Sequence, residues 1–480
     1  MTSLKNLQTA TPLVFKGDPV MESYVQDTMM RGNPDALLRA RDIQEIREAL
    51  KFCSAHKIPV TFCGSQTSMT GASVATEGLL ISTQKLEKIL DVGMQDGRGY
   101  VRAEPGIPVA QLKRAVAAEG WFYPPAPTSE EEARIGACVS TNASGEDSLQ
   151  YGSTRNFVRE LKVLLANGSK KIFARKKGEK IFKGPGPAGF ALEGENPIDY
   201  FIGGEGTLGF ICEVTLDLVP LPKGFLAGLA PFPSVDAALQ FVAATFRTKI
   251  LNPRALELID ENALRYMKSH PLFPASLASA KTLIYFKQEY SSEAEQEIVL
   301  GSWLSQIEKY STPALAQDTL VATNPKQQAD IRKMRHHIPA QVNEEWQKFW
   351  DAGGGKVGSD WWVPVSKLIP MLQFVYQTGK EAKIPLMAYA HVGRGHPHVN
   401  YLCKTPEEKR KAEKLLIECC KKAVSLGGGV AGEHGLGKLH RDLLAIQCSP
   451  SEIKKMIAIK KTFDPNWILG RGNILPAPVR

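Results

Sequence analysis

The chain has few cysteines and no apolar run that approaches the length needed to cross a membrane. Its 480 residues include eight cysteines, which form no CxxC pair and no regular spacing: Cys53, Cys63, Cys138, Cys212, Cys403, Cys419, Cys420 and Cys448. This pattern argues against a disulfide framework and favours free, buried thiols in a reducing compartment. The first twenty residues lack the charged start and apolar core of a signal peptide. We therefore expect a cytoplasmic protein.

The positive charge is scattered, and no aromatic and basic strip suggests stacking on bases. The formal net charge is +9 and the pI is about 9.0. We expect an anionic small ligand rather than nucleic acid. At 480 residues the chain exceeds the size at which one hydrophobic core keeps growing, so two or more domains are expected.

Helix and strand patterns alternate from Pro34 onward and change in character near Pro222. The stretch 43–57 places one apolar face on a helix: Ile43, Ile46, Ala49, Leu50 and Cys53. Buried strands are predicted in 58–64 and 154–168, and a long strand follows a glycine-rich turn in 198–222. After Pro222 helices and strands alternate again, which predicts an α/β or α+β second domain. The last stretch is a helix followed by an ordered tail that packs back on the protein.

Glycine-rich and hydroxyl-rich loops recur, although one apparent fingerprint is rejected. The segment Gly184–Gly189 matches GxGxxG, but no strand leads into a helix there, and two prolines remove backbone N–H groups that a pyrophosphate would need. The loop Cys63–Gly71 (CGSQTSMTG) suits a phosphate better, because it follows a predicted strand and offers N–H and hydroxyl donors. Similar loops in 124–156 and Gly203–Gly209 together predict a cradle for an extended cofactor.

In their order along the chain, these segments resemble a known family. CGSQTSMTGASV, VRAEPGIPVAQL, the run 124–165 and FIGGEGTLGFICEVTL are similar to the FAD-binding domain of the vanillyl-alcohol oxidase / p-cresol methylhydroxylase superfamily. HVGRGHPHVN, GGGVAGEHGLG and FDPNWILGRGNIL resemble the C-terminal half of its D-2-hydroxyacid dehydrogenase branch, which includes D-lactate and D-2-hydroxyglutarate dehydrogenases and glycolate oxidase subunits. The resemblance covers roughly residues 30 to 478.

This resemblance implies an α+β fold in which a two-part FAD-binding domain of the vanillyl-alcohol oxidase type carries an α/β cap. The implied domains are a FAD-binding domain (30–222), a cap or substrate domain with a metal site (223–440), and a C-terminal helix and tail that return to the FAD domain (441–480). FAD is expected to bind noncovalently, since no histidine or cysteine stands where it would attach to the flavin ring. The residues implied to hold it are Gly64, Ser65, Gln66, Thr67, Ser68, Thr70, Gly71, Pro127, Thr128, Gly136, Asn142, Ala143, Gly145, Gly152, Gly204, Glu205, Gly206, Ile211 and Asn473.

Three histidines crowd the segment Ala388–His398. His391 and His398 are seven residues apart with glycines between them, so a turn must bring them together. His396 and His398 alternate like residues on a strand and share one face. Single histidines in polar turns are more often hydrogen-bonded structural groups than ligands, but three with a downstream carboxylate favour a metal.

The resemblance assigns roles to this cluster. His391, His398 and Glu433 would bind a divalent metal, with zinc expected; His434 would be the catalytic base, and Asn400 would face the substrate. Arg335 would clamp the substrate carboxylate and Lys356 would assist. The motif here reads HxGRGHPHxN rather than HxGDGNxHxN, so Arg394 and His396 depart from the pattern. His396 could be a further ligand, a substrate contact or a support for the loop, and these alternatives stay open.

We therefore predict a FAD-dependent dehydrogenase that oxidises a D-2-hydroxy acid to the 2-oxo acid, with D-lactate as the first candidate and D-2-hydroxyglutarate as the second. Electrons would pass to a quinone, a cytochrome or an electron-transfer flavoprotein. The oligomeric state is left open, with a homodimer as one candidate. Three alternatives are weighed against this prediction: an alkyl-glycerone-phosphate synthase-like enzyme, a noncatalytic FAD subunit of a glycolate-oxidase-type complex, and a metal-dependent hydrolase that would leave the glycine cradle unexplained.

Overall fold

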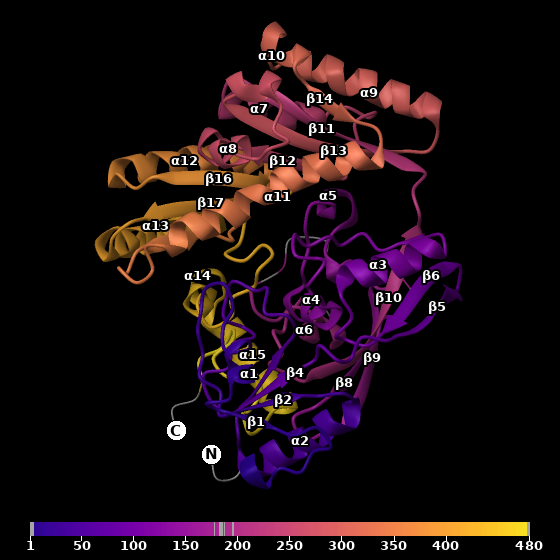
Figure 1. Ribbon diagram of the computed structural model, residues 1–480, viewed down its shortest axis with the longest axis vertical. Coiled ribbons are helices and arrows are strands. Elements are labelled where there is room, and N and C mark those ends of the chain that lie inside the picture. The colour runs from indigo at the N-terminus through magenta and orange to yellow at the C-terminus, as the bar shows by residue number, and fades with distance from the viewer. Residues whose placement is uncertain (1–3, 177, 182–185, 187, 194–195, 478–480) are drawn as a thin grey trace. The chain divides into compact units, whose positions relative to one another are not determined.

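The computed structural model describes residues 4–176, 178–181, 186, 188–193 and 196–477 (Figure 1). Half of the rejected GxGxxG match, residues 184, 185 and 187 of Gly184–Gly189, lies outside these residues. The chain divides into two compact units. Unit 1 comprises residues 1–145, 152–221 and 431–480, and unit 2 comprises 146–151 and 222–430. Residues 431–440, expected in the cap, are thus grouped with unit 1.

Unit 1 begins with a small sheet of order β1-β2-β4-β3, in which β2, β4 and β3 run parallel. Its strands are β1 (Val14–Phe15), β2 (Ala36–Arg39), β3 (Val60–Cys63) and β4 (Leu79–Ser82). Helix α2 (Ile43–His56) connects β2 to β3 and buries Ile46, Ala49, Leu50 and Cys53. The Asp42 side chain caps its first turn by accepting from the Glu45 N–H, and Lys57 ends it in the left-handed region. The predicted helix and strand are confirmed.

The second sheet of unit 1 is antiparallel and has the order β5-β6-β10-β8-β9, with β7 beside β10. Its strands are β5 (Ile89–Gln95), β6 (Arg98–Ala103), β7 (Trp121–Phe122), β8 (Val158–Leu164), β9 (Lys170–Ala174) and β10 (Phe210–Pro220). The remaining helices of unit 1 are η1 (Leu4–Asn6), α1 (Pro19–Glu22), α3 (Val109–Ala118), α4 (Ile135–Thr141), η2 (Thr154–Asn156), α6 (Ile198–Phe201), η6 (Arg441–Leu443), α14 (Leu444–Gln447) and α15 (Pro450–Phe463).

Helix α4 corrects one expectation, because the run 124–156 is not a loop throughout. Ile135, Cys138 and Val139 are buried, and their spacing of three and four residues places them on one helical face. Asn142 then ends the helix with a φ of 53°, in the left-handed region that asparagine tolerates better than most residues.

Unit 2 is built on one seven-stranded antiparallel sheet of order β14-β11-β13-β12-β16-β17-β15. Its strands are β11 (Gly224–Phe232), β12 (Ala255–Ile259), β13 (Thr282–Tyr290), β14 (Leu320–Ala322), β15 (Gly355–Gly358), β16 (Leu386–His391) and β17 (His396–Cys403). Its helices are α5 (Ser148–Tyr151), α7 (Val235–Thr245), α8 (Glu261–Lys268), η3 (Ala275–Ser279), α9 (Glu293–Glu308), α10 (Pro313–Gln317), α11 (Pro325–Gln347), η4 (Val365–Lys367), α12 (Leu368–Ala382), η5 (Val392–Arg394) and α13 (Pro406–Ser425).

Helices cover both faces of this sheet, and strand alternation shows which helix covers which face. Leu283 and Tyr285 of β13 belong to a core that includes apolar residues of α8 and α11. Phe286, on the opposite face, stacks on Trp303 of α9 with ring centroids 4.4 Å apart. Helix α11 contacts β14 and β15, the strands at the two edges of the sheet, and therefore spans one face of that sheet (Figure 1).

The C-terminal tail returns to the first sheet of unit 1. The Val60 N–H donates to the Ile468 carbonyl at 2.8 Å, and the Gly470 N–H donates to the Val60 carbonyl at 2.9 Å. Lys460 of α15 fixes the start of the tail: its Nζ lies 2.5 Å from Asp464 Oδ2 and also donates to the Leu469 carbonyl. Burial lowers the pKa of Lys460 to about 8 despite the opposing effect of Asp464. The tail is thus part of the fold of unit 1.

Replacing Asp464 by Asn should therefore destabilise unit 1, because the buried Lys460 ammonium would lose its countercharge. We expect a loss of about 3–5 kcal/mol in the free energy of unfolding, measured by urea denaturation. The matched control is Asp442→Asn, whose carboxylate is 98% exposed and lies 3.7 Å from Arg441; it should change stability by less than about 0.5 kcal/mol. Equal effects of the two substitutions would contradict this role of the pair.

Candidate functional site

A row of polar side chains crosses the face of the unit 2 sheet that α11 covers. On β17, His396, His398 and Asn400 share a face with Leu402, which belongs to the core under α11. Cross-strand partners continue the row, since directly opposed residues share a face. His391 of β16 opposes His396, and Lys356 of β15 opposes Leu402. The strand pattern predicted for His396 and His398, and the turn after His391, are both confirmed.

Glu257 of β12 lies at the centre of this row and is 1% exposed. Its Oε2 lies 2.5 Å from Arg335 Nε, and its Oε1 lies 2.7 Å from His391 Nδ1. Burial alone would raise the pKa of Glu257, but the charges of Arg335 and His391 lower it to about 2. A carboxylate that accepts from Nδ1–H fixes the tautomer of a histidine, so that Nε2 is the nitrogen that can bind a metal.

The histidine rings lie close enough together to act on one ligand. The centroids of His391 and His398 are 5.2 Å apart, and those of His396 and His398 are 4.7 Å apart. All three side chains are buried, with at most 8% of each exposed. Imidazole nitrogens beside a carboxylate are the donors that zinc and similar ions prefer, so this donor set fits a divalent cation.

The three predicted anion-binding and substrate-facing residues all lie in this row. Arg335 extends from α11, with its guanidinium carbon 5.8 Å from the Tyr389 ring centroid. Asn400 is buried and donates to the His398 carbonyl at 3.3 Å. Lys356 is 5% exposed, and among the described residues no acidic side chain pairs with it. Burial lowers the pKa of Lys356 to about 8.

An ion-pair network extends the row toward β13, and the sequence reasoning missed it. Asp147 pairs with Arg254 at 2.5 Å and with Lys287 at 3.1 Å, while Glu146 pairs with Lys287 at 3.2 Å.

Glu257 was also missed from the sequence. Its signal was a charged residue inside the apolar strand pattern ALELI, since a buried charge requires a partner.

In unit 1, the structure brings the predicted cofactor segments together. Ala126 bridges to Gly145, the Gly203 N–H donates to the Val139 carbonyl, and Arg134 donates to the Ser65 hydroxyl at 2.9 Å. A side chain at Gly145 would collide with the Ala126 carbonyl, and the φ of Gly145 is +121°, so only glycine allows this approach.

The loop after β3 fits a phosphate group. The backbone N–H groups of residues 65–69 have no hydrogen-bond acceptor among the residues that the structure describes. Gln66 adopts a φ of 53°, so the backbone turns through the left-handed region there. Consecutive unpaired N–H groups in such a turn form a concave anion site. The loop therefore suits the pyrophosphate of a dinucleotide.

A buried cluster joins this loop to Glu205 and Asn473. Asn473 Nδ2 donates to the carbonyls of Ala72 and Glu205, and Lys438 Nζ donates to Asn473 Oδ1 at 2.8 Å and to the Gly71 carbonyl at 3.1 Å. The Glu205 carboxylate accepts from the N–H groups of Leu436 and Gly437, although burial raises its pKa to about 7. Sequence reasoning did not single out Lys438, whose ammonium ties Gly71 to Asn473.

The other predicted cofactor residues lie along the same segments of unit 1. Gly136 N–H donates to the Pro105 carbonyl, and a side chain at Gly136 would meet Pro105. Ile211 lies buried on β10. Glu433 and His434, the predicted third ligand and base, belong to unit 1 and are half-buried. Their roles remain predictions.

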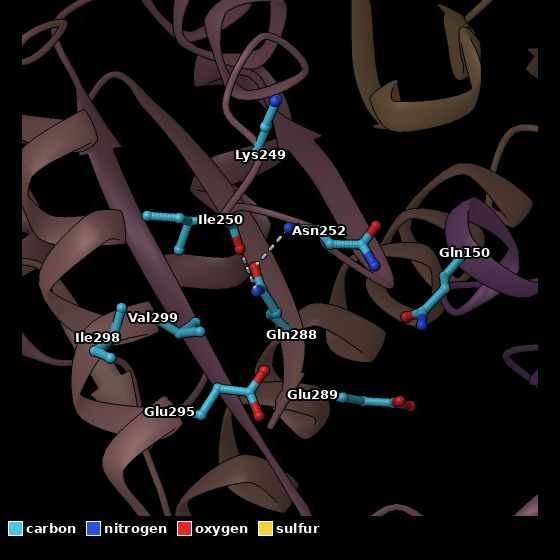
Figure 2. Close-up of a pocket in the computed structure, with 9 residues that line it drawn as sticks. All are labelled: Gln150, Lys249, Ile250, Asn252, Gln288, Glu289, Glu295, Ile298 and Val299. Carbon is cyan, nitrogen blue, oxygen red and sulfur yellow. Dashed lines mark hydrogen bonds between the residues drawn. The ribbon is translucent and has the colours of Figure 1, made fainter. Parts of the chain in front are cut away.

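A pocket of about 400 Å³ lies elsewhere in unit 2, near the start of α9 (Figure 2). Gln288, one of the residues that line it, accepts from the Asn252 N–H and donates to the Ile250 carbonyl. The Gln288 side chain also accepts from Trp303 of α9, so it points to the face opposite Lys287 and the polar row. The pocket contains none of the predicted site residues.

Two further expectations can be compared with the structure. All eight cysteines are free; seven are buried, as predicted, and Cys448 is partly exposed. Among the described residues, no helix is both long enough and apolar enough to span a membrane.

Comparisons with known proteins agree with this arrangement. The family described as "FAD binding domain" matches residues 34–172, and the family "FAD linked oxidases, C-terminal domain" matches residues 221–474. The chain is 28% identical to a D-lactate dehydrogenase of Anaerostipes hadrus over 97% of this chain and 95% of that protein. It is 30% identical to a D-lactate dehydrogenase of Archaeoglobus fulgidus (92% and 91%) and 26% identical to a D-2-hydroxyglutarate dehydrogenase of Stutzerimonas stutzeri (92% and 91%).

A solved structure of an alkyldihydroxyacetonephosphate synthase shares the fold, with a TM-score of 0.69 at 16% identity over 98% of this chain and 83% of that one. The predicted fold class, a FAD-binding domain of the vanillyl-alcohol oxidase type with a second domain and a returning tail, is confirmed. Since the matched oxidase family covers more than half of the chain, the protein belongs to the FAD-linked oxidases and is an FAD-linked oxidoreductase.

Proposed function

We propose that this chain oxidises a D-2-hydroxy acid to the 2-oxo acid, with D-lactate as the first candidate substrate and D-2-hydroxyglutarate as the second. The observation that carries the proposal is the buried row of His391, His398 and Lys356 on one sheet face, together with the buried Arg335 of α11. It combines donors for a cation with positive groups for a carboxylate. The relatives named D-lactate and D-2-hydroxyglutarate dehydrogenase support the same substrate class.

FAD is the proposed cofactor, bound noncovalently in unit 1. When bound, FAD accepts the hydride that leaves C2 of the substrate. The N–H groups of the loop 65–69 would bind its pyrophosphate, and Lys438 and Asn473 would hold that loop in place. The segments around Asn142, Gly145 and Gly204–Gly206 would enclose the rest of the cofactor.

A divalent cation, with zinc preferred, is proposed on His391, His398 and Glu433. Chain connectivity supports Glu433, which follows Val430, the last residue of unit 2, by three positions. Three residues span at most about 11 Å. Gly429 bridges to Trp362, and the next residue, Val363, donates to the Gly395 carbonyl in the histidine turn. The chain thus leaves unit 2 beside that turn. A cation there would supply Lewis acidity that lowers the pKa of the substrate hydroxyl.

The remaining roles fall to side chains that handle charge and protons. Arg335 and Lys356 would bind the substrate carboxylate, and Asn400 would donate a hydrogen bond to the substrate. The neutral imidazole of His434 would take the proton of the C2 hydroxyl as the hydride leaves. Electrons would then pass to a quinone, a cytochrome or an electron-transfer flavoprotein.

The proposal predicts stereospecific bleaching of the flavin. Anaerobic mixing of the FAD-loaded protein with D-lactate or D-2-hydroxyglutarate should remove the oxidised-flavin absorbance, and the L-isomers should not. Replacing His434 by Ala should slow this reduction about 10²–10⁴-fold without loss of FAD, because a general base contributes that much.

The matched control is His337→Ala, a histidine of unit 2 that contacts Ser269 outside the polar row. It should reduce flavin at the unsubstituted rate. No bleaching by any D-2-hydroxy acid would overturn the proposed substrate class, and normal bleaching in His434→Ala would overturn the role of His434.

The affinity for the 2-oxo acid product should depend on pH through Lys356. Its pKa is lowered to about 8, so the ammonium is present below pH 8 and is lost as the pH rises through that value. Carboxylate binding should therefore weaken above pH 8. Lys356→Met should raise the dissociation constant about 10–100-fold at pH 7, as expected for a lost hydrogen bond to a charged group.

Titration of the bound flavin spectrum with the 2-oxo acid at several pH values measures both effects. The Lys356→Met variant should show no weakening centred on pH 8. If its pH profile matches that of the unsubstituted protein, Lys356 does not bind the carboxylate.

A further inference from the structure

A second set of metal-binding donors lies in the polar row and shares only one residue with the proposed cation site. It consists of Asp360, His396 and His398, whose ligand atoms all lie within 4.8 Å of one another. His396 Nε2 is 3.1 Å from Asp360 Oδ1. In a tetrahedral site with bonds of about 2.0–2.2 Å, two ligand atoms lie roughly 3.3–3.6 Å apart. Small side-chain shifts would therefore suffice to place one ion between these donors.

The backbone holds these three residues in position without help from unit 1. His396 and His398 share a face of β17 by strand alternation. Asp360 follows β15, and the preceding residue, Ser359, is fastened to β17: its N–H donates to the Val399 carbonyl at 2.9 Å, and its hydroxyl accepts from the Val399 N–H at 3.1 Å. All three donors therefore belong to one compact unit, two of them on β17 and Asp360 just after β15.

The chemistry of the set matches a borderline divalent ion. It offers one carboxylate oxygen and two imidazole nitrogens, and three protein ligands leave a coordination position for water or another oxygen ligand. The histidines are at most 8% exposed and the Asp360 side chain is 11% exposed, so they are largely shielded from water. The motif HxGRGHPHxN supplies the imidazole of His396 where the family pattern carries an amide.

We infer that Asp360, His396 and His398 bind a divalent cation of the zinc type on their own, as an alternative to the set that contains His391 and Glu433. Because both sets use His398, an ion bound to one set excludes an ion from the other. Unit 2 thus retains a cation when the Glu433 carboxylate does not coordinate it. The inference concerns binding of the ion alone and does not depend on the proposed oxidation of a hydroxy acid.

A four-member comparison tests the inference: the unsubstituted protein, Glu433→Gln, His396→Asn and the double variant. Each full-length, FAD-loaded protein is stripped with a chelator, and Zn²⁺ binding is measured by calorimetry and by metal content after dialysis. We expect Glu433→Gln to keep one tightly bound zinc and the double variant to lose more than about 100-fold in affinity. Removing a direct ligand should lower the zinc affinity at least as much as removing a residue that hydrogen-bonds to a ligand.

Two further variants keep the test specific. Asp360→Asn in the Glu433→Gln background should weaken zinc binding as His396→Asn does. His337→Asn in the same background should not, although His337 pairs with His270 at 5.0 Å between ring centroids. Co²⁺ loading adds an independent readout, because the visible spectrum of Co²⁺ changes with its ligands.

The inference is overturned if Glu433→Gln alone abolishes zinc binding, or if the double variant binds zinc as tightly as Glu433→Gln. These outcomes are separate from a failure of the proposed function. A protein that binds zinc through Asp360 and His396 but whose flavin is not reduced by any D-2-hydroxy acid would overturn the proposed function alone.

Discussion

The candidate site depends on the hydrogen-bonded pairs that the buried Glu257 carboxylate makes with Arg335 and His391. This carboxylate lies buried in the middle of a sheet, where a charge without partners would cost several kcal/mol. Arg335 from α11 and His391 from β16 provide those partners at 2.5 and 2.7 Å. Three elements far apart in the sequence are thereby joined, and the orientation of His391 is fixed. The remaining histidines follow, because strand register places His396 opposite His391.

The segments of unit 1 that are predicted to hold FAD offer it backbone groups and not a buried charge. In unit 1 the N–H groups of the loop 65–69, which have no acceptor among the described residues, offer positive partial charge without a charged side chain. Such a loop requires support, and the cluster of Lys438, Asn473 and Glu205 provides it from two distant segments. The returning tail is needed for this support, because it carries Asn473.

Much of this architecture could be predicted from the sequence. Helix α2, the strands β3 and β10 and the alternation of His396 and His398 follow from local periodicity, which depends only on neighbouring residues. The order of the glycine loops identified the fold. Local sequence patterns could not predict which side chains pair across distant positions. Glu257, Asp147 and Lys438 matter because of the partners that the fold brings to them. Helix α4 was missed because small and polar residues surround its short apolar face.

The proposed role of Glu257 is to organise the unit 2 histidines as ligands for a cation. Zinc affinity of Glu257→Gln in a His396→Asn background tests it most directly, because only the set that contains His391 remains there. We expect zinc binding about 10–100-fold weaker than in His396→Asn alone, as for the loss of an outer partner. Glu289→Gln, which removes an acidic partner of the buried Arg254 elsewhere in the unit, should leave zinc affinity unchanged. Unaltered zinc affinity on replacing Glu257 by Gln would contradict this role.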